Sequence, residues 1–434
     1  MSVYASLCFI AFAAIMIAYI NTLVGKMQTT IVITGGSLIL SLIIILGGQF
    51  DLFHLDEIER EILTKIDFQH FLLQGMLGFL LFAGGLGIKL SHLSNQKWEI
   101  SFLALGATLF STFFVGYATF YACQAIGIPL DLIYCLLFGA LISPTDPIAV
   151  LAIVKKLKAP EQISIQIEGE SLFNDGFGLV IFATIFAVAF GGEPATISGI
   201  SSLLLEEAVG GIVYGFAIGI FMHFMIKNIH DHSMELLLTF TVPTAGYALA
   251  YIMGVSGPLA MVVSGIMLGN VTLADGFSKE GGKQLHRFWE LVDEFLNGVL
   301  FLLIGMVMLT FTFHWQDLSL MLISIPIVLL ARYLSIKTMY IGFNRFRSYN
   351  PMSVKILTWG GLRGGLALAM ALAIPSGISP SGIMELPEKG IDVREIILVM
   401  TYSVALFSIL IQGSTMNGMI MKAKRLDETE KPKD

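Results

Sequence analysis

The stretch Ser143-Pro144-Thr145-Asp146-Pro147 interrupts an apolar run that extends from about residue 132 to residue 154. Its two prolines remove two backbone donors and disfavour helical backbone at the residues that precede them. Thr145 and Asp146 are therefore expected in an unwound break inside an otherwise helical segment. An acid in such a break, beside freed carbonyl groups and two helix ends, is typical of an ion site in a membrane transporter. A simple proline kink is the alternative interpretation.

The composition places the whole chain in a membrane. Of its 434 residues, 56% are hydrophobic and only 13% are charged, and the mean hydropathy is +0.81, whereas roughly a quarter of the residues of a soluble protein are charged. A bilayer core takes about 20 helical residues. The pattern predicts an all-α polytopic membrane protein of about 13 transmembrane helices. The expected spans are 3–24, 29–48, 68–89, 99–122, 132–154, 162–190, 197–226, 235–254, 256–271, 288–310, 318–342, 353–374 and 394–420.

The basic residues predict the orientation of these spans, because loops rich in Lys and Arg face the cytoplasm. An odd number of spans puts nineteen of the 25 basic residues on one side and four on the other, with Arg332 and Arg363 inside the membrane. The N-terminus is therefore expected outside the cell membrane, and the C-terminus with a short tail at 421–434 is expected in the cytoplasm. No block is polar enough for a separate soluble domain, so we expect one membrane domain over 1–434, neither an enzyme nor a partner of nucleic acid.

A second group of polar side chains occupies the middle of the next span, at Glu168-Gly169-Glu170-Ser171-Leu172-Phe173-Asn174-Asp175. Glu170 and Asn174 are four residues apart, as are Ser171 and Asp175, so the four share one side of a helix. Asp175 is about 20 Å into its span at 1.5 Å per residue, a depth similar to that of Asp146. The side chains of Thr145, Asp146, Ser171, Asn174 and Asp175 offer oxygen atoms and one amide. Such a set suits a hard cation such as sodium and needs no cofactor.

Two arginines lie too deep in their spans to reach water easily. Arg332 is expected to pair with a buried carboxylate, and Glu170 is our choice, which leaves Asp175 as the group that titrates. Arg363 lies in Gly360-Gly361-Leu362-Arg363-Gly364-Gly365, where four glycines loosen the helix. This segment, with Gly361, Arg363 and Gly364, is the second helix break that an inverted-repeat transporter with two crossed broken helices would need.

The motifs Ser143-Pro-Thr-Asp-Pro-Ile-Ala-Val-Leu151 and Gly169-Glu-Ser-Leu-Phe-Asn-Asp175 closely resemble those of sodium–proton antiporters of the monovalent cation–proton antiporter-1 family. Phe79–Leu86, Leu296–Gly305, Ala331-Arg332 and Gly361–Gly364 extend the resemblance over nearly the whole chain. It implies a homodimer in the bacterial or archaeal cell membrane. Each protomer would have an ion-transporting core at about 68–190 and 318–420 and a dimerisation scaffold at about 1–48 and 197–310.

The resemblance also implies residue roles. Asp175 would bind the proton and the sodium or lithium ion in turn, with Thr145, Ser171 and Asp146 as ligands or water-mediated supports. Asn174 would orient the site, and the Glu170–Arg332 pair would brace it. Ala83 is a departure, since members often have Glu there, and it leaves sodium versus potassium preference open.

The mechanism expected is competition at one carboxylate. A single titrating acid, with Asn174 where a second acid would stand, exchanges one proton for one monovalent cation and moves no net charge. Three alternatives are a potassium–proton antiporter on the same scaffold, a cation channel and an intramembrane protease. The two breaks and the single-carboxylate site favour alternating access over a channel, and the Gly-x-Gly-Asp pattern of such a protease is not found.

Overall fold

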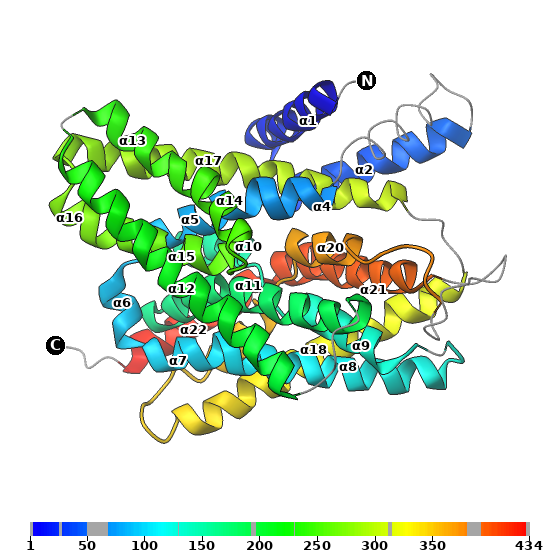
Figure 1. Ribbon diagram of the computed structural model, residues 1–434. Coiled ribbons are helices and arrows are strands. Elements are labelled where there is room, and N and C mark those ends of the chain that lie inside the picture. The colour runs from blue at the N-terminus through cyan, green and yellow to red at the C-terminus, as the bar shows by residue number, and fades with distance from the viewer. Residues whose placement is uncertain are drawn as a thin grey trace. The chain divides into compact units, whose positions relative to one another are not determined.

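The computed structural model describes residues 3–25, 28–49, 68–128, 130–191, 197–229, 231–310, 315–379 and 392–430. In these ranges the regular structure is helical, and the only β-type pairing is one isolated antiparallel bridge between Asp146 and Leu362. Figure 1 labels the helices along the chain. The prediction of an all-helical fold is confirmed.

Eleven helical stretches of the described residues are long and apolar enough to cross a membrane. They correspond to eleven of the thirteen expected spans. The other two, 132–154 and 353–374, are each divided into two short helices, α9 (Leu132–Ile142) and α10 (Ile148–Leu157), and α19 (Ser353–Trp359) and α20 (Gly365–Leu372). The two broken helices expected from the sequence are therefore present, and each break lies at the predicted motif.

The chain divides into two compact units, which are described separately. The first comprises Met1–Leu72, Phe110–Ser164 and Asn297–Asp434, and the second comprises Leu73–Leu109 and Ile165–Leu296. The chain passes from one unit to the other four times, in the π-helical turn Phe71–Met76, in α8 (Thr108–Ala125), in α11 (Glu161–Phe190) and in α17 (Lys279–Met306). The two units are defined by contacts within the chain and not by movement. The predicted transport core and dimerisation scaffold therefore remain a prediction.

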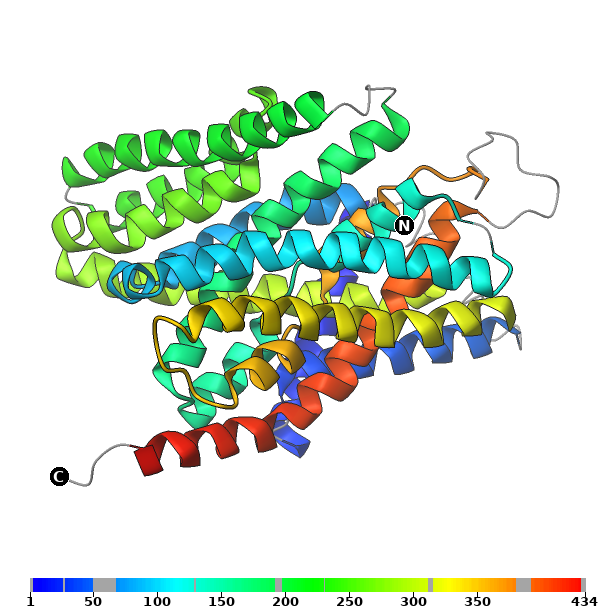
Figure 2. The same ribbon diagram turned by 90° about the horizontal axis from the view of Figure 1, so that it is seen from below.

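The first unit contains both broken helices. Its other long elements are α1 (Val3–Val24), α2 (Thr29–Gln49), α18 (Trp315–Phe343) and α21 (Val393–Phe407). A π-helical turn at Ser408–Gln412 joins α21 to α22 (Gly413–Glu430), so helix continues through most of the predicted tail. α21 packs against α18 and α20, as the yellow and orange ribbons of Figures 1 and 2 show.

The second unit is a bundle built on small residues. α15 (Gly257–Met267) packs against α5 (Leu77–Gly87) and α12 (Ile197–Lys227), which Figure 2 shows as neighbouring ribbons. A Cβ atom on Gly265 would lie 2.5 Å from the Phe82 carbonyl oxygen, and one on Gly85 would lie 2.6 Å from that of Val262. Small residues at membrane helix crossings let backbones approach and pack closely. Here they hold α5 directly against α15.

Further short helices complete this unit, and their bounds place the segments used below. They are α6 (Leu90–Asn95), α7 (Lys97–Ser101), α13 (His232–Thr241), α14 (Tyr247–Ile252) and α16 (Leu273–Asp275). π-helical turns at Val242–Gly246 and Leu268–Thr272 connect α13 to α14 and α15 to α16.

Candidate ion-binding site

The first break separates α9 from α10 at the motif predicted from the prolines. The Ser143 hydroxyl donates to the Gly139 carbonyl oxygen at 2.6 Å, which closes the last turn of α9. Pro147 precedes α10, where its missing N–H costs no helix hydrogen bond. Thr145 is buried and Asp146 is partly buried, so the break exposes little of its polar surface.

The two breaks meet in the first unit. The Asp146 backbone N–H donates to the Leu362 carbonyl oxygen at 2.8 Å, which forms the antiparallel bridge. Gly361, Arg363 and Gly364 all lie in the second break, between α19 and α20. A Cβ atom on Gly364 would lie only 2.2 Å from Asp146 Oδ2, so a side chain there would displace the acid. The glycines thus permit two unwound segments to lie in contact.

Asp146 faces the beginnings of both downstream half-helices. Its Oδ1 accepts a hydrogen bond from the Ile148 backbone N–H at 3.0 Å, at the start of α10. Its Oδ2 lies against Gly364, the residue that precedes α20. Helix N-termini carry unpaired N–H groups and partial positive charge, which stabilise a carboxylate. Asp146 therefore compensates the two positive helix ends at the break.

Two arginines and one glutamine compensate the opposite ends. Arg363 is 2% exposed, and its Nη1 donates to the Pro144 carbonyl oxygen at 2.6 Å and to the Ser143 carbonyl oxygen, just after α9. Such carbonyl groups carry partial negative charge, so a buried cation is favourable there. The buried guanidinium of Arg363 thus compensates the C-terminal end of α9.

The end of α19 has two donors of its own. Arg332 donates to the Leu357 carbonyl oxygen from Nε at 3.3 Å and from Nη2 at 3.1 Å. Gln412, in the π-helical turn after α21, donates to the Trp359 carbonyl oxygen at 3.0 Å. A Cβ atom on Gly361 would lie 2.6 Å from Arg332 Nε, so this glycine makes room for the guanidinium group.

The acid group predicted on α11 lies in the second unit, on one side of the helix. Glu170, Ser171 and Asn174 are buried, and Asp175 is partly buried. The other side of the helix packs through glycine: Cβ atoms on Gly169 and Gly176 would lie 2.7 Å from Ile100 and 2.6 Å from Leu259. At 3.6 residues per turn these glycines are opposite the polar group. The glycine side of α11 therefore packs against α7 and α15.

The structure thus places the predicted residues in two sets. Thr145, Asp146, Arg332, Gly361, Arg363 and Gly364 form one set in the first unit, and Glu170, Ser171, Asn174 and Asp175 form the other set in the second unit. The joining of the two sets around one cation, and the Glu170–Arg332 pair, remain predictions. Two glutamines at the helix ends were not predicted from the sequence. Gln412 donates to the Trp359 carbonyl oxygen, and Gln28 donates to the Ala149 carbonyl oxygen in α10. Their only sequence signal is an amide directly before an apolar span, for Gln28, and inside one, for Gln412.

Comparison with known proteins now decides the family. Residues 10–422 match the family described as transmembrane sodium/hydrogen exchangers. The chain belongs to this family. The relatives include the Na⁺/H⁺ antiporter NhaP of Pseudomonas aeruginosa, which is 39% identical over 413 residues and covers 94% of both chains. The Na⁺/H⁺ antiporter NhaH of Halobacillus dabanensis is 31% identical over 89% of this chain and 91% of its own.

A solved structure has the same fold as this exchanger. It is that of the sodium proton antiporter MjNhaP1 of Methanocaldococcus jannaschii, with a TM-score of 0.72 at 21% identity. The alignment covers 98% of this chain and 99% of that one. The exchanger is therefore a multi-pass membrane protein of a transporter family, and the resemblance seen in the sequence motifs is confirmed.

Proposed function

We propose that this exchanger moves sodium or lithium ions across the cell membrane in exchange for protons, with one proton for each cation. The proposal is supported by family membership, by the antiport activity in the names of its relatives, and by the two broken helices that meet at Asp146. Ala83 alone leaves potassium open as the cation, and the names of the relatives, which are Na⁺/H⁺ antiporters, favour sodium over it. The exchanger would need no cofactor and would act as a homodimer with its C-terminus in the cytoplasm.

Asp175 is the proposed carrier of both ions. It lies partly buried in the middle of α11, four residues from Ser171 and next to the buried Asn174. A proton or a bound cation each neutralises this carboxylate, and the two compete for it. Thr145 and Ser171 would supply further oxygen ligands to the dehydrated cation, and Asn174 would orient the carboxylate.

The charges at the two breaks would stay fixed during transport. Asp146 faces the N-terminal ends of α10 and α20, while Arg363 and Arg332 donate to carbonyl groups at the ends of α9 and α19. Each of these charges is already balanced by a helix end. We therefore assign Asp146 to holding the break and, through water or directly, to supporting the cation, while Asp175 alone changes its occupancy.

Transport by purified protein in liposomes tests the proposal. A sodium gradient across vesicles that contain a pH-sensitive dye should move protons, and Asp175→Ala should abolish this movement. Glu161→Gln is the matched control, since Glu161 is an exposed acid in the first turn of the same helix, and it should transport normally. Sodium-driven proton movement by Asp175→Ala would refute the assignment of the carrier.

A further inference from the structure

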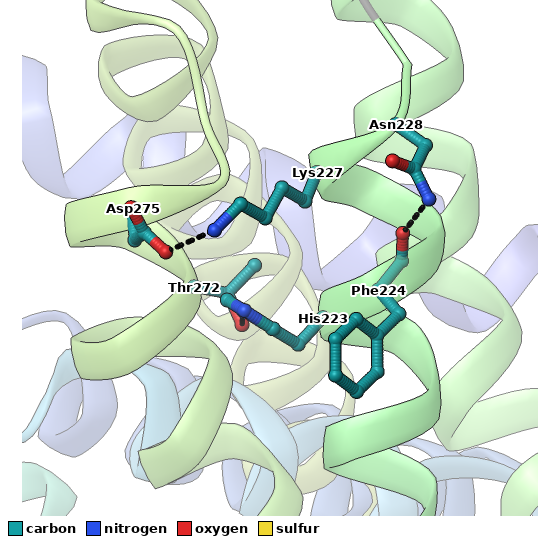
Figure 3. A network of polar contacts seen from close by, with 6 residues as sticks. All are labelled: His223, Phe224, Lys227, Asn228, Thr272 and Asp275. Atoms are coloured by element: carbon teal, nitrogen blue, oxygen red, sulfur yellow. Dashed lines mark hydrogen bonds and ion pairs between the residues drawn. The ribbon is translucent and has the colours of Figure 1, made fainter.

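Four helix ends meet at one end of the second unit. α12 and α16 end there, at Lys227 and Asp275, and α13 and α17 begin there. Figure 3 shows Lys227 reaching across to Asp275, with a distance of 2.6 Å between Nζ and Oδ2. The charge distribution of the sequence predicts that this end faces the cytoplasm.

A buried acid lies between the first turns of α13 and α17. Glu235 is only 1% exposed, and its Oε2 has no hydrogen-bond partner among the described residues. A Cβ atom on Gly281 would lie 2.0 Å from this oxygen, so only glycine leaves room for it. The carboxylate therefore lies against the N-terminal turn of a 28-residue helix. A helix N-terminus favours a negative charge, but a buried carboxylate without a donor is costly.

One imidazole lies within reach of this acid and of the adjoining helix cap. His232 Nδ1 is 3.7 Å from Glu235 Oε2 and 2.9 Å from the hydroxyl of Ser278. The same hydroxyl accepts a hydrogen bond from the Gly281 backbone N–H at 3.0 Å and so caps α17. Ser278 thus joins the imidazole to the beginning of α17.

The proton on His232 decides which of its neighbours this nitrogen serves. A neutral imidazole can use the Nδ1 lone pair to accept the Ser278 O–H, and then it offers nothing to Glu235. An imidazolium has a proton on both nitrogens, so Nδ1 can only donate, and its positive charge then lies 3.7 Å from Glu235 Oε2. Histidine is the side chain that ordinarily changes charge between about pH 5 and 8. The two protonation states therefore hold α13 against α17 with different strength.

Several charged groups of the surrounding helices make other contacts. Asp231 accepts from the Ser233 backbone N–H at 2.9 Å, and Lys283 pairs with the exposed Glu280 at 3.7 Å on α17. From α12 and α16, Lys227 pairs with Asp275, and His223 Nδ1 is 3.1 Å from the Thr272 hydroxyl. Both contacts are drawn in Figure 3. Among the ion pairs of the described residues, the basic side chain that lies near Glu235 is His232, at 3.7 Å.

We infer that Glu235 and His232 form a second proton site that acts as a latch between α13 and α17 and is separate from the transport site. With its proton the pair holds the two helix starts together and slows exchange. Loss of the proton leaves Glu235 without its cation, loosens this junction and permits full turnover. The effect on exchange rests on the proposed antiport function, whereas the protonation of the junction does not.

Sodium titration distinguishes the latch from competition at the transport site. Competition alone lowers the pH of half-maximal exchange by about one unit for each tenfold rise in sodium concentration. A latch that binds no sodium instead sets a pH below which additional sodium does not restore exchange. The wild type is expected to reach such a limit. In Glu235→Gln and His232→Gln the half-maximal pH should continue to follow sodium. A wild type without a limit, or variants that keep it, would overturn the latch.

Two controls keep these outcomes interpretable. Asp275→Asn removes a charge from the exposed pair at the same end of the unit and should keep the wild-type limit. Amide hydrogen exchange of the purified protein reports on the first turn of α17 without transport. After correction for intrinsic rates, protection there should fall as the pH rises in the wild type but not in Glu235→Gln, and equal behaviour of the two would refute the site. If no sample exchanges sodium for protons but protection still depends on Glu235, the antiport proposal fails and the proton site stands.

Discussion

Substitution of Gly364 by alanine tests the contact between the two breaks. The added Cβ would lie 2.2 Å from Asp146 Oδ2, whereas ordinary contacts begin at 3.4 Å, so the carboxylate must move by about 1.2 Å. That movement breaks its 3.0 Å hydrogen bond from the Ile148 N–H. Loss of a helix cap costs about 0.5 to 2 kcal/mol. With the residual crowding we expect about 2 kcal/mol, which lowers the ratio of intact to disrupted break by about 30-fold.

Two measurements on Gly364→Ala check this value. The Tm of the purified protein should fall by several degrees, and sodium-dependent proton flux in liposomes should fall more than tenfold, given about 1.4 kcal/mol for each factor of ten. Gly418→Ala is the matched control in the same unit, because no atom lies within 4 Å of its added Cβ. In a helix alanine is favoured over glycine by about 0.5 to 1 kcal/mol, so this control should melt no lower than the wild type. A Gly364→Ala protein with wild-type Tm and flux would refute the contact.

Three further substitutions test the helix ends and the helix crossing. Arg363→Met leaves two carbonyl groups after α9 without their cation, and hydrogen bonds to charged groups contribute about 1.5 to 3 kcal/mol each; its Tm should fall further than that of Arg363→Lys, and equal values would contradict this role. Gln412→Leu should lower the free energy of unfolding by about 1 to 3 kcal/mol, because it leaves the carbonyl group at the end of α19 unpaired. Denaturant unfolding measures this loss. Gln412→Asn keeps an amide and should lose no more stability than Gln412→Leu. Gly265→Leu forces α15 away from α5, because even a Cβ atom at this position would lie 2.5 Å from the Phe82 carbonyl oxygen. The yield of folded protein in size-exclusion chromatography should drop sharply. Gly342→Ala should show no such drop, because its added Cβ would have no atom within 4 Å.

The spans and both breaks were predictable because their signals are local. Apolar length shows where the chain crosses a bilayer, and Pro144 with Pro147, or four glycines near Arg363, show where a helix cannot continue. In the part of the chain that the structure describes, eleven unbroken spans and two divided ones agree with these patterns. Apolar length and the positions of Pro and Gly are enough to predict the spans and the breaks.

The partners of the buried charges were not predictable in the same way. The pairing of Arg332 with Glu170 stays a prediction. In the first unit Arg332 also donates to the Leu357 carbonyl oxygen, because a helix end with partial negative charge satisfies a guanidinium as well. Asp146 was expected chiefly as a support for the cation, and its contacts with Ile148 and Gly364 add the compensation of two helix starts. Helix ends acquire these partners only after distant segments pack, and spacing along the chain does not report that packing.

Glu235 illustrates the same limit outside the proposed ion site. Its burial depends on Gly281, which lies far along the chain at the start of another helix. In the sequence Glu235 is an ordinary acid near the beginning of an apolar span. Only the packing of α13 against α17 shows that its carboxylate is enclosed.

The stoichiometry of exchange tests the central claim most directly. Flux through the purified exchanger in liposomes is measured while the membrane potential is clamped and sodium and proton gradients of the same direction are varied. If Asp175 alone binds either one proton or one sodium ion, net flux should vanish when the two gradients are equal in ratio, and this null point should be the same at every potential. A null point that moves with the potential would show net charge transfer and contradict exchange at a single carboxylate.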